Sequence, residues 1–218
     1  MTGSCSCGLL RYQLLRPPIV VHCCHCTSCQ RETGSAFALN GFVENENLQM
    51  LPPSAPTVPG SIAEPSADLK PALPLPEEWS GPWSSNNNNN AHDDGAAKTI
   101  DPIYGAVPSE SGCGVRMSTC PRCFICVWCL YGAGSGSVMK AVRIGTLDKA
   151  WQIDPDVHIY TRSKRSFISL QDGKPVFEDF YDDRSFYRPD GQERMANMIV
   201  AMKKLLAEKK AEKEKEEE

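Results

Sequence analysis

The sequence of 218 residues has no apolar run of about 18 residues, the length that spans a membrane. Its N-terminus has no basic stretch ahead of an apolar one, so it does not resemble a secretory signal peptide. The formal net charge of −4 provides no basic surface for nucleic acid or anionic lipid. We therefore expect a cytoplasmic protein, with the nucleus as the alternative, that binds neither nucleic acid nor membrane. The sequence does not indicate an oligomeric state.

Cysteine, in contrast, is abundant and clustered. The count of 11 is odd, which argues against a complete set of disulfides. In a reducing compartment, clustered cysteines favour metal binding over disulfides. Seven of them fall into three short motifs: C-x-C at Cys5 and Cys7, C-x-C-x-x-C at Cys24, Cys26 and Cys29, and C-P-x-C at Cys120 and Cys123.

The first and last of these motifs predict one closed zinc site. Zinc takes four thiolates in tetrahedral geometry, so a single pair of cysteines cannot complete the site. The C-P-x-C turn places both sulfurs on one side, and the Cys5–Cys7 pair is the candidate for the other half. Such a site would join the N-terminal strand to the middle of the chain and would be structural. The alternative is two unconnected pairs of reduced cysteines.

Cys24, Cys26 and Cys29, called the cysteine trio from here on, are one ligand short of a tetrahedron, and a catalytic metal needs such an open position. We expect a labile zinc ion there, and hence two Zn²⁺ ions per chain. The fourth ligand is then water, a substrate thiol or a histidine. The alternatives are a second closed site and a trio that binds no metal and acts in redox chemistry. The possible additional ligands are Cys23, His22, His25 and His158, although alternation would turn His25 away.

The remaining cysteines are harder to interpret. Cys126 and Cys129 form another C-x-x-C, but inside an apolar stretch, where two small buried residues are the favoured interpretation. Metal binding by this pair is the alternative, and it leaves open which pair completes the closed site. The sequence does not indicate a role for Cys113.

Charged residues near the end of the β-rich part provide candidates for substrate binding. Arg162, Lys164 and Arg165 form a small basic group, which is either a solvated turn or an anchor for the carboxylates of an acidic substrate. His158 precedes them in a predicted strand, and a single histidine in a strand is either structural or catalytic.

The distribution of apolar residues predicts one mainly β domain. Alternating apolar residues indicate short strands in residues 1–51 and 100–180, and Asp172-Gly173 predicts a turn between two of them. Residues 52–99 are rich in proline and contain five consecutive asparagines, which predicts a disordered insertion. Helical spacing of apolar residues predicts a C-terminal helix with a charged tail over residues 190–218.

Five segments in order carry a resemblance to a known family: GSCSCGLLRY at 3–12, HCCHCTSCQRETGSAFA at 22–38, CPRC at 120–123, RIGTLD at 143–148 and HIYTRSKRSFISLQDGKPVFE at 158–178. In these segments the chain resembles the glutathione-dependent formaldehyde-activating enzyme (GFA) family, whose domain is shared with centromere protein V. The chain departs from the family pattern at Phe124, where glycine is usual, at Phe167, where tryptophan is usual, and in its long insertion.

The resemblance implies an open, largely antiparallel β architecture around a structural zinc. It also implies that the trio holds a labile catalytic zinc. The activity attached to the family is the addition of glutathione to formaldehyde, giving S-hydroxymethylglutathione, and it is classed as a carbon–sulfur lyase for the reverse direction. The implied partners are thus a small thiol and a small aldehyde. The implied ligands of the structural zinc are Cys5, Cys7, Cys120 and Cys123.

A second hypothesis comes from a different class of protein. The same motifs fit a β module that zinc stabilises and that binds a partner without catalysis, with the insertion and the charged tail as interaction segments. The two hypotheses differ at the trio, because an enzyme needs one exchangeable position on its metal and a scaffold needs none.

Overall fold

The computed structural model describes residues 1–54, 99–110, 112, 114–131, 138–187 and 189–216. The predicted insertion lies almost entirely outside the described residues, and so does Cys113. No helix within these ranges has both the length and the apolar character needed to cross a bilayer. The strands and α-helices are β1 (Thr2–Ser4), β2 (Arg11–Leu14), β3 (Val20–Cys24), α1 (Thr27–Thr33), β4 (Ala38–Glu44), β5 (Leu48–Leu51), β6 (Ile103–Val107), β7 (Val115–Thr119), β8 (Cys126–Tyr131), β9 (Met139–Arg143), β10 (Val157–Ile159) and α2 (Pro189–Glu216).

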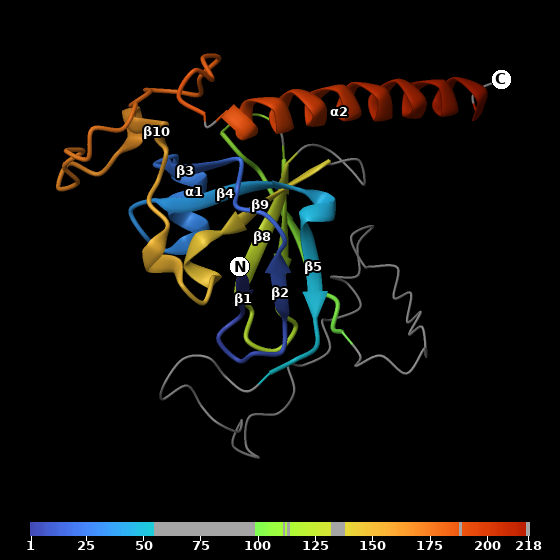
Figure 1. Ribbon diagram of the computed structural model, residues 1–218, viewed down its shortest axis with the longest axis horizontal. Coiled ribbons are helices and arrows are strands. Elements are labelled where there is room, and N and C mark those ends of the chain that lie inside the picture. The colour runs from blue at the N-terminus through green and yellow to red at the C-terminus, as the bar shows by residue number, and fades with distance from the viewer. Residues whose placement is uncertain (55–98, 111, 113, 132–137, 188, 217–218) are drawn as a thin grey trace.

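The strands form two sheets, which Figure 1 shows together with the long helix α2. One sheet has seven strands in the order β10-β3-β4-β9-β8-β7-β6, and the other has three in the order β1-β2-β5. Neighbouring strands are antiparallel except for β10 and β3, which are parallel. The prediction of a mainly β, largely antiparallel fold with a C-terminal helix is therefore confirmed. The larger sheet joins strands from both sides of the residues that the structure does not describe.

Alternation along β3 places neighbouring cysteines on opposite faces of the larger sheet. Cys23 lies opposite Leu39 of β4 and His158 of β10, whereas Cys24 lies opposite Ala38. Because successive side chains of a strand point to opposite faces, Cys23 and Cys24 face different surroundings.

The face that carries Cys23 packs against the three-stranded sheet. Tyr12 of β2 is fully buried, and its ring meets that of Trp128 edge-on at a centroid distance of 5.8 Å. The Tyr12 hydroxyl group lies 2.6 Å from the Thr146 hydroxyl group. The Gly3 backbone lies against the Tyr12 ring. A Cβ atom at Gly3 would be only 2.6 Å from Tyr12 and 2.7 Å from the Thr146 carbonyl oxygen. A side chain at Gly3 would therefore separate the two layers.

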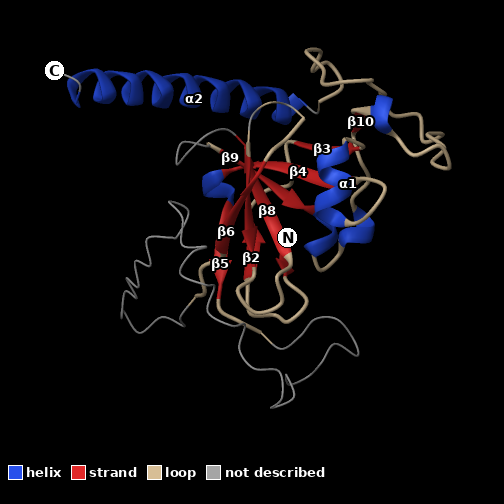
Figure 2. Ribbon diagram, turned by 180° about the vertical axis from the view of Figure 1, so that it is seen from behind, coloured by secondary structure: helices blue, strands red, loops and turns tan. Residues whose placement is uncertain are grey.

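The opposite face is covered by the two α-helices. Met195 and Met198 of α2 are buried in one cluster with Ile19 and Val20. Beyond this first part, α2 extends away from the sheets toward the C-terminus (Figure 1). Helix α1 lies beside β3 and β4 (Figure 2) and ends at Gly34, whose φ of 63° is left-handed.

Two local predictions were wrong. Residues 27–33 were expected among strands, but they form α1, because Cys26 caps the first turn by accepting a hydrogen bond from the Cys29 backbone N–H. Asp172-Gly173 does not join two antiparallel strands. Gly173 does turn the chain with a φ of 73°, but the segment after it forms only an isolated parallel bridge between Val176 and His158.

Candidate functional site

Two turns from distant parts of the chain bring four cysteines together. Cys5 and Cys7 lie in the turn after β1, where the Cys5 N–H donates to the Leu10 carbonyl oxygen. Cys120 and Cys123 lie in the turn between β7 and β8, which Phe124 closes with a φ of 58°. Left-handed backbone explains why glycine is usual at the Phe124 position.

The four sulfur atoms have the spacing that a tetrahedral ion requires. All four lie within 4.8 Å of one another. The Sγ–Sγ distance is 3.5 Å between Cys5 and Cys7 and 3.7 Å between Cys7 and Cys120. Zinc–sulfur bonds of about 2.3 Å give tetrahedral edges of about 3.8 Å. Backbone N–H groups donate to Cys5 and Cys120, as expected for sulfurs that carry negative charge. A hydrogen bond from the Cys5 thiol lowers the pKa of the Cys120 thiol to about 4.

The cysteine trio is built at the junction of β3 and α1. Cys24 ends β3, Cys26 is the N-cap of α1, and Cys29 lies one turn into the helix. All three are at most 5% exposed, and their sulfur atoms lie within 4.8 Å of one another. Among the described residues, no histidine, aspartate, glutamate or further cysteine joins this group. The three sulfur atoms could therefore bind one metal ion together. Such an ion would have one coordination position that none of these protein side chains fills.

One thiol of the trio, that of Cys26, ionises readily, because the other two thiols donate hydrogen bonds to its thiolate. Hydrogen bonds from the thiols of Cys24 and Cys29 lower the pKa of Cys26 to about 3. The same hydrogen bond to Cys26 raises the pKa of Cys24. The Cys29 backbone N–H, 3.3 Å from the Cys26 sulfur, adds to the stabilisation of the thiolate. A cation at this point would displace the remaining protons, because metals bind the thiolate form.

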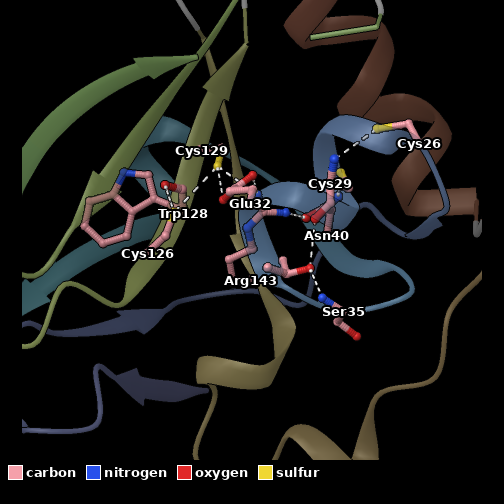
Figure 3. A network of polar contacts seen from close by, with 10 residues as sticks. Cys26, Cys29, Glu32, Ser35, Asn40, Cys126, Trp128, Cys129 and Arg143 are labelled. Carbon is pink, nitrogen blue, oxygen red and sulfur yellow. Dashed lines mark hydrogen bonds and ion pairs between the residues drawn. The ribbon is translucent and has the colours of Figure 1, made fainter. Parts of the chain in front are cut away.

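A buried polar network supports the trio from behind, and Figure 3 shows its side chains pointing toward one another. The Asn40 amide lies 3.9 Å from the Cys29 sulfur, a weak contact, and accepts a hydrogen bond from Arg143. Arg143 also forms an ion pair with Glu32 of α1 and lies 3.2 Å from the Cys129 sulfur. These residues come from α1, β4, β8 and β9, so no local sequence pattern indicated the network.

The network explains the second C-x-x-C motif. A bulge in β8 near Ser118 and Thr119 of β7 lets the Cys126 and Cys129 sulfurs approach to 3.7 Å. These two sulfurs and a Glu32 oxygen lie within 4.8 Å of one another. However, the Arg143 guanidinium already contacts both Glu32 and Cys129. A fixed positive charge occupies the position that a cation would need, so this group is better described as an arginine–carboxylate–thiol cluster.

The histidines do not complete the trio. His22 points to the trio's face of the sheet, but its Nε2 lies 2.5 Å from the Tyr181 hydroxyl group, and burial lowers its pKa to about 3. His25 and His158 lie together with Cys23 in a separate buried group. Burial first, and then the charges of His158 and Lys164, lower the pKa of His25 to about 4.

Of the predicted basic group, Arg162 is linked to the trio through Glu110. Its guanidinium stacks over the Tyr160 ring at 5.6 Å and forms ion pairs with Asp179 and, at 3.1 Å, with Glu110. Glu110 in turn accepts a hydrogen bond from the backbone N–H of Thr27, the residue next to Cys26. Sequence reasoning missed both Glu110 and Tyr160.

The rest of the basic group serves its own turn or faces solvent. Lys164 donates to the carbonyl oxygens of Ile168, at 2.6 Å, and Arg165, at 3.3 Å. The Arg165 side chain is exposed. The three basic residues therefore do not converge on one point beside the trio.

Comparison with known proteins bears on the N-terminal part of the chain. Residues 1–60 match the family model of the glutathione-dependent formaldehyde-activating enzyme. The match confirms the resemblance over this segment, which includes Cys5, Cys7 and the whole trio. No curated protein matches the chain. The GFA match and the cysteine groups together fit a zinc-binding domain of the GFA type.

Proposed function

We propose that the protein adds a small thiol, glutathione or a similar compound, to formaldehyde or another small aldehyde, with a zinc ion at the cysteine trio. The reaction is that of a carbon–sulfur lyase running toward synthesis. One observation carries the proposal. In the segment that matches the GFA family, three buried thiols converge while no fourth side chain among the described residues joins them. Three protein ligands and one free position are the arrangement that a catalytic zinc needs.

The chemistry required is modest. A free thiol with a pKa of about 8.5 is mostly protonated at neutral pH, and coordination to zinc would hold it as the thiolate. Sulfur then bonds to the aldehyde carbon, and the carbonyl oxygen takes up one proton, so that thiol and aldehyde combine with no leaving group. Burial of the trio keeps this step away from bulk water.

The chain's own residues hold the sulfurs in place. Cys26 is fixed by the N–H of Cys29, and Cys29 is approached by the Asn40 amide. A hydrogen bond from Cys24 lowers the pKa of Cys29, but the hydrogen bond to Cys26 and burial outweigh it and raise that pKa to about 11. The charge of Arg143, held by Asn40 and Glu32, opposes this rise. The network therefore fixes the positions of the sulfurs, which is what an ion with one exchangeable ligand requires. Such an ion would displace the remaining thiol protons.

Substrate carboxylates have one charged group within reach of the trio. Arg162 is 47% exposed, and its present partners Glu110 and Asp179 are both carboxylates. A carboxylate of glutathione can replace either partner without leaving the guanidinium unpaired. Of the other two basic residues, Arg165 is exposed to solvent, and the Lys164 amine is bound to carbonyl oxygens of its own turn. His158 lies on the other face of the sheet, and we assign it no part in this site.

Calorimetry of the zinc-loaded protein tests thiol recognition. We expect glutathione to bind and S-methylglutathione, whose sulfur cannot ionise, to bind at least about tenfold more weakly, because only the thiolate gains the metal bond. Cys26→Ser should remove the preference. Ser28→Ala in the same helix turn is the matched control, since Ser28 lies between two ligands without being one. Equal binding of both compounds would show that the metal does not recognise the thiol.

Catalysis is measured separately. Thiols add to formaldehyde unaided, so exchange spectroscopy at equilibrium should compare rates with and without protein. We expect acceleration that Cys26→Ser abolishes and Ser28→Ala preserves. Binding without acceleration would instead support the module that zinc stabilises and that only binds a partner.

A further inference from the structure

A third set of metal-binding side chains remains unused by the proposed thiol chemistry. The Cys23 sulfur and ring nitrogens of His25 and His158 lie within 4.8 Å of one another, and all three residues are at most 5% exposed. We propose that Cys23, His25 and His158 bind a third divalent metal ion, best matched by zinc, on the face of the sheet opposite the trio, with Asp172 as the outer partner of His158.

The strands bring the three donors together. Parallel pairing places His158 of β10 directly opposite Cys23 of β3, so both side chains point to the same face. His25 follows β3, and its backbone N–H donates to the Ile159 carbonyl oxygen at 3.0 Å, which ties it to β10. The donors therefore come from adjacent, hydrogen-bonded segments and not from loops that meet by chance.

The proton positions on His158 follow from its outer contact. Its Nε2 lies 2.9 Å from an Asp172 carboxylate oxygen. An ionised carboxylate only accepts hydrogen bonds, so Nε2 carries the proton and Nδ1 presents a lone pair toward His25. A carboxylate that fixes the tautomer of a histidine is the usual outer partner of a metal-binding imidazole.

Without an ion, the Nε2 atom of His25 can form a hydrogen bond with only one of its two neighbours at a time. Its Nε2 lies 3.2 Å from His158 Nδ1 and 3.5 Å from the Cys23 sulfur. If Nε2 is protonated, it can donate to His158, but it cannot accept the Cys23 proton. If Nε2 is unprotonated, it can accept from Cys23, but two nitrogen lone pairs then face each other. A cation at the centre satisfies both nitrogens and a Cys23 thiolate at once.

The distances match the edges of a zinc tetrahedron. Bonds of about 2.3 Å to sulfur and about 2.0 Å to nitrogen give edges of about 3.5 Å between sulfur and nitrogen and about 3.3 Å between two nitrogens. The observed contacts are 3.5 Å and 3.2 Å. One sulfur and two imidazoles form a donor set of the kind that zinc accepts.

Three ligands leave a fourth position, and the surroundings indicate what can reach it. Cys23, His25 and His158 also line a cavity of about 280 Å³. The rest of its lining is almost entirely apolar: Phe37, Leu39, Pro155, Ile168 and Leu170. The fourth ligand is therefore water or the single polar atom of a small apolar molecule. The apolar wall distinguishes this cavity from the trio, which the charged residues Arg143 and Glu32 support from behind.

Metal analysis of the full chain, purified under reducing conditions and loaded with zinc before gel filtration, tests the proposal. We expect about three zinc equivalents in the wild type and about two in Cys23→Ala and in His158→Ala. Cys126→Ala is the matched control, since it removes a cysteine whose cluster is already neutralised by Arg143, and it should keep all of the metal. A wild-type value of about two that neither variant lowers would overturn the third site.

A wild-type measurement keeps the test independent of folding and of the thiol chemistry. Nitrogen NMR of the imidazole rings should show that zinc shifts His158 Nδ1 and His25 Nε2 while His158 Nε2 keeps its proton. Neither the trio nor the group of Cys5, Cys7, Cys120 and Cys123 contains histidine. Zinc bound only at those two groups would leave both rings unchanged, and that result would overturn the proposal. Failure of glutathione to bind would count against the proposed function and not against this site.

Discussion

The ion pair between Glu44 and Arg194 offers the sharpest test of how α2 is held. Arg194 donates through Nε and Nη2 to the two carboxylate oxygens of Glu44, each at 2.6 Å, and through Nη1 to the Pro17 carbonyl oxygen at 3.0 Å. The side chains are 5% and 11% exposed. Arg194→Met keeps the apolar stem but leaves the Glu44 carboxylate buried without its partner. It should therefore destabilise the protein far more than the loss of a surface pair.

The magnitude follows from burial. Removing one partner of a buried pair costs about 3 to 5 kcal/mol, whereas exposed pairs contribute at most about 1 kcal/mol. For a chain of this size, each kcal/mol lowers the melting temperature by about 2 to 4 °C, so we expect a decrease of about 10 °C. The double variant Glu44→Leu/Arg194→Met removes both charges and should recover most of that loss.

The pH dependence provides an independent check. Burial raises the pKa of Glu44, but the hydrogen bond and the charge of Arg194 outweigh it, so the pKa is lowered in the folded state. The pair's contribution is therefore present above the unfolded-state pKa and is lost as pH falls through the lowered folded-state value. In Arg194→Met the two contributions of Arg194 are lost, so burial, the largest remaining influence, should raise the pKa of Glu44 relative to the wild type. The difference in stability between variant and wild type should then shrink as the pH is lowered through the normal glutamate range.

Urea unfolding followed by circular dichroism at several pH values measures these effects. Two results would refute the reasoning. One is a decrease in unfolding free energy below about 1 kcal/mol for Arg194→Met at neutral pH, which is typical of a solvent-exposed ion pair. The other is a double variant as unstable as Arg194→Met. The first result would mean that apolar contacts such as those of Met195 and Met198 dominate the docking of α2. The second would mean that the loss does not come from an unpaired Glu44.

Two further predictions concern the zinc sites and the undescribed segment. Cys120→Ser should lower the melting temperature much more than Cys26→Ser, because binding at a closed site is coupled to folding; thermal melts in the opposite order would reverse the roles of the two sites. Replacing residues 55–98 with a Gly/Ser linker of about twelve residues should preserve zinc content and melting temperature. Ser54 is kept in this variant, because its N–H donates to the Gly8 carbonyl oxygen at 3.0 Å. A large loss of stability would mean that the replaced segment packs on the domain.

Much of the fold could be predicted because its signals are local. The apolar residues of β2 and β10 alternate in the sequence, β3 begins with consecutive β-branched residues, and the helical spacing of α2 is visible from Met195 onward. Helix α1 could not be predicted in this way, since its seven residues carry no apolar period and its start is fixed by a sulfur cap. The turn at Asp172-Gly173 was identified, but the segment after it follows β10 in parallel, a choice that depends on tertiary contacts.

The motifs that predicted metal sites are short-range, whereas the residues that tune those sites are not. Spacing alone selected Cys24, Cys26 and Cys29. The residues that support them, Arg143 and Asn40, lie 103 positions apart in the chain and meet only across β4 and β9. Arginine in a strand carries no signal that it will be buried. Only the assembled sheet, with Glu32 beside it, supplies the partners that make burial of the charge acceptable.

The most informative contrast lies between two adjacent residues. In the sequence, Cys23 directly precedes the motif that begins at Cys24, and it was considered only as an extra ligand for the trio. Strand geometry turns their sulfurs to opposite faces of the sheet, so the first meets two imidazoles in an apolar cavity and the second meets two thiols beside a helix. Two adjacent cysteines can thus belong to two different metal sites. Successive side chains of a strand point to opposite faces of the sheet, so the strand decides which donors can meet, whatever their spacing in the sequence.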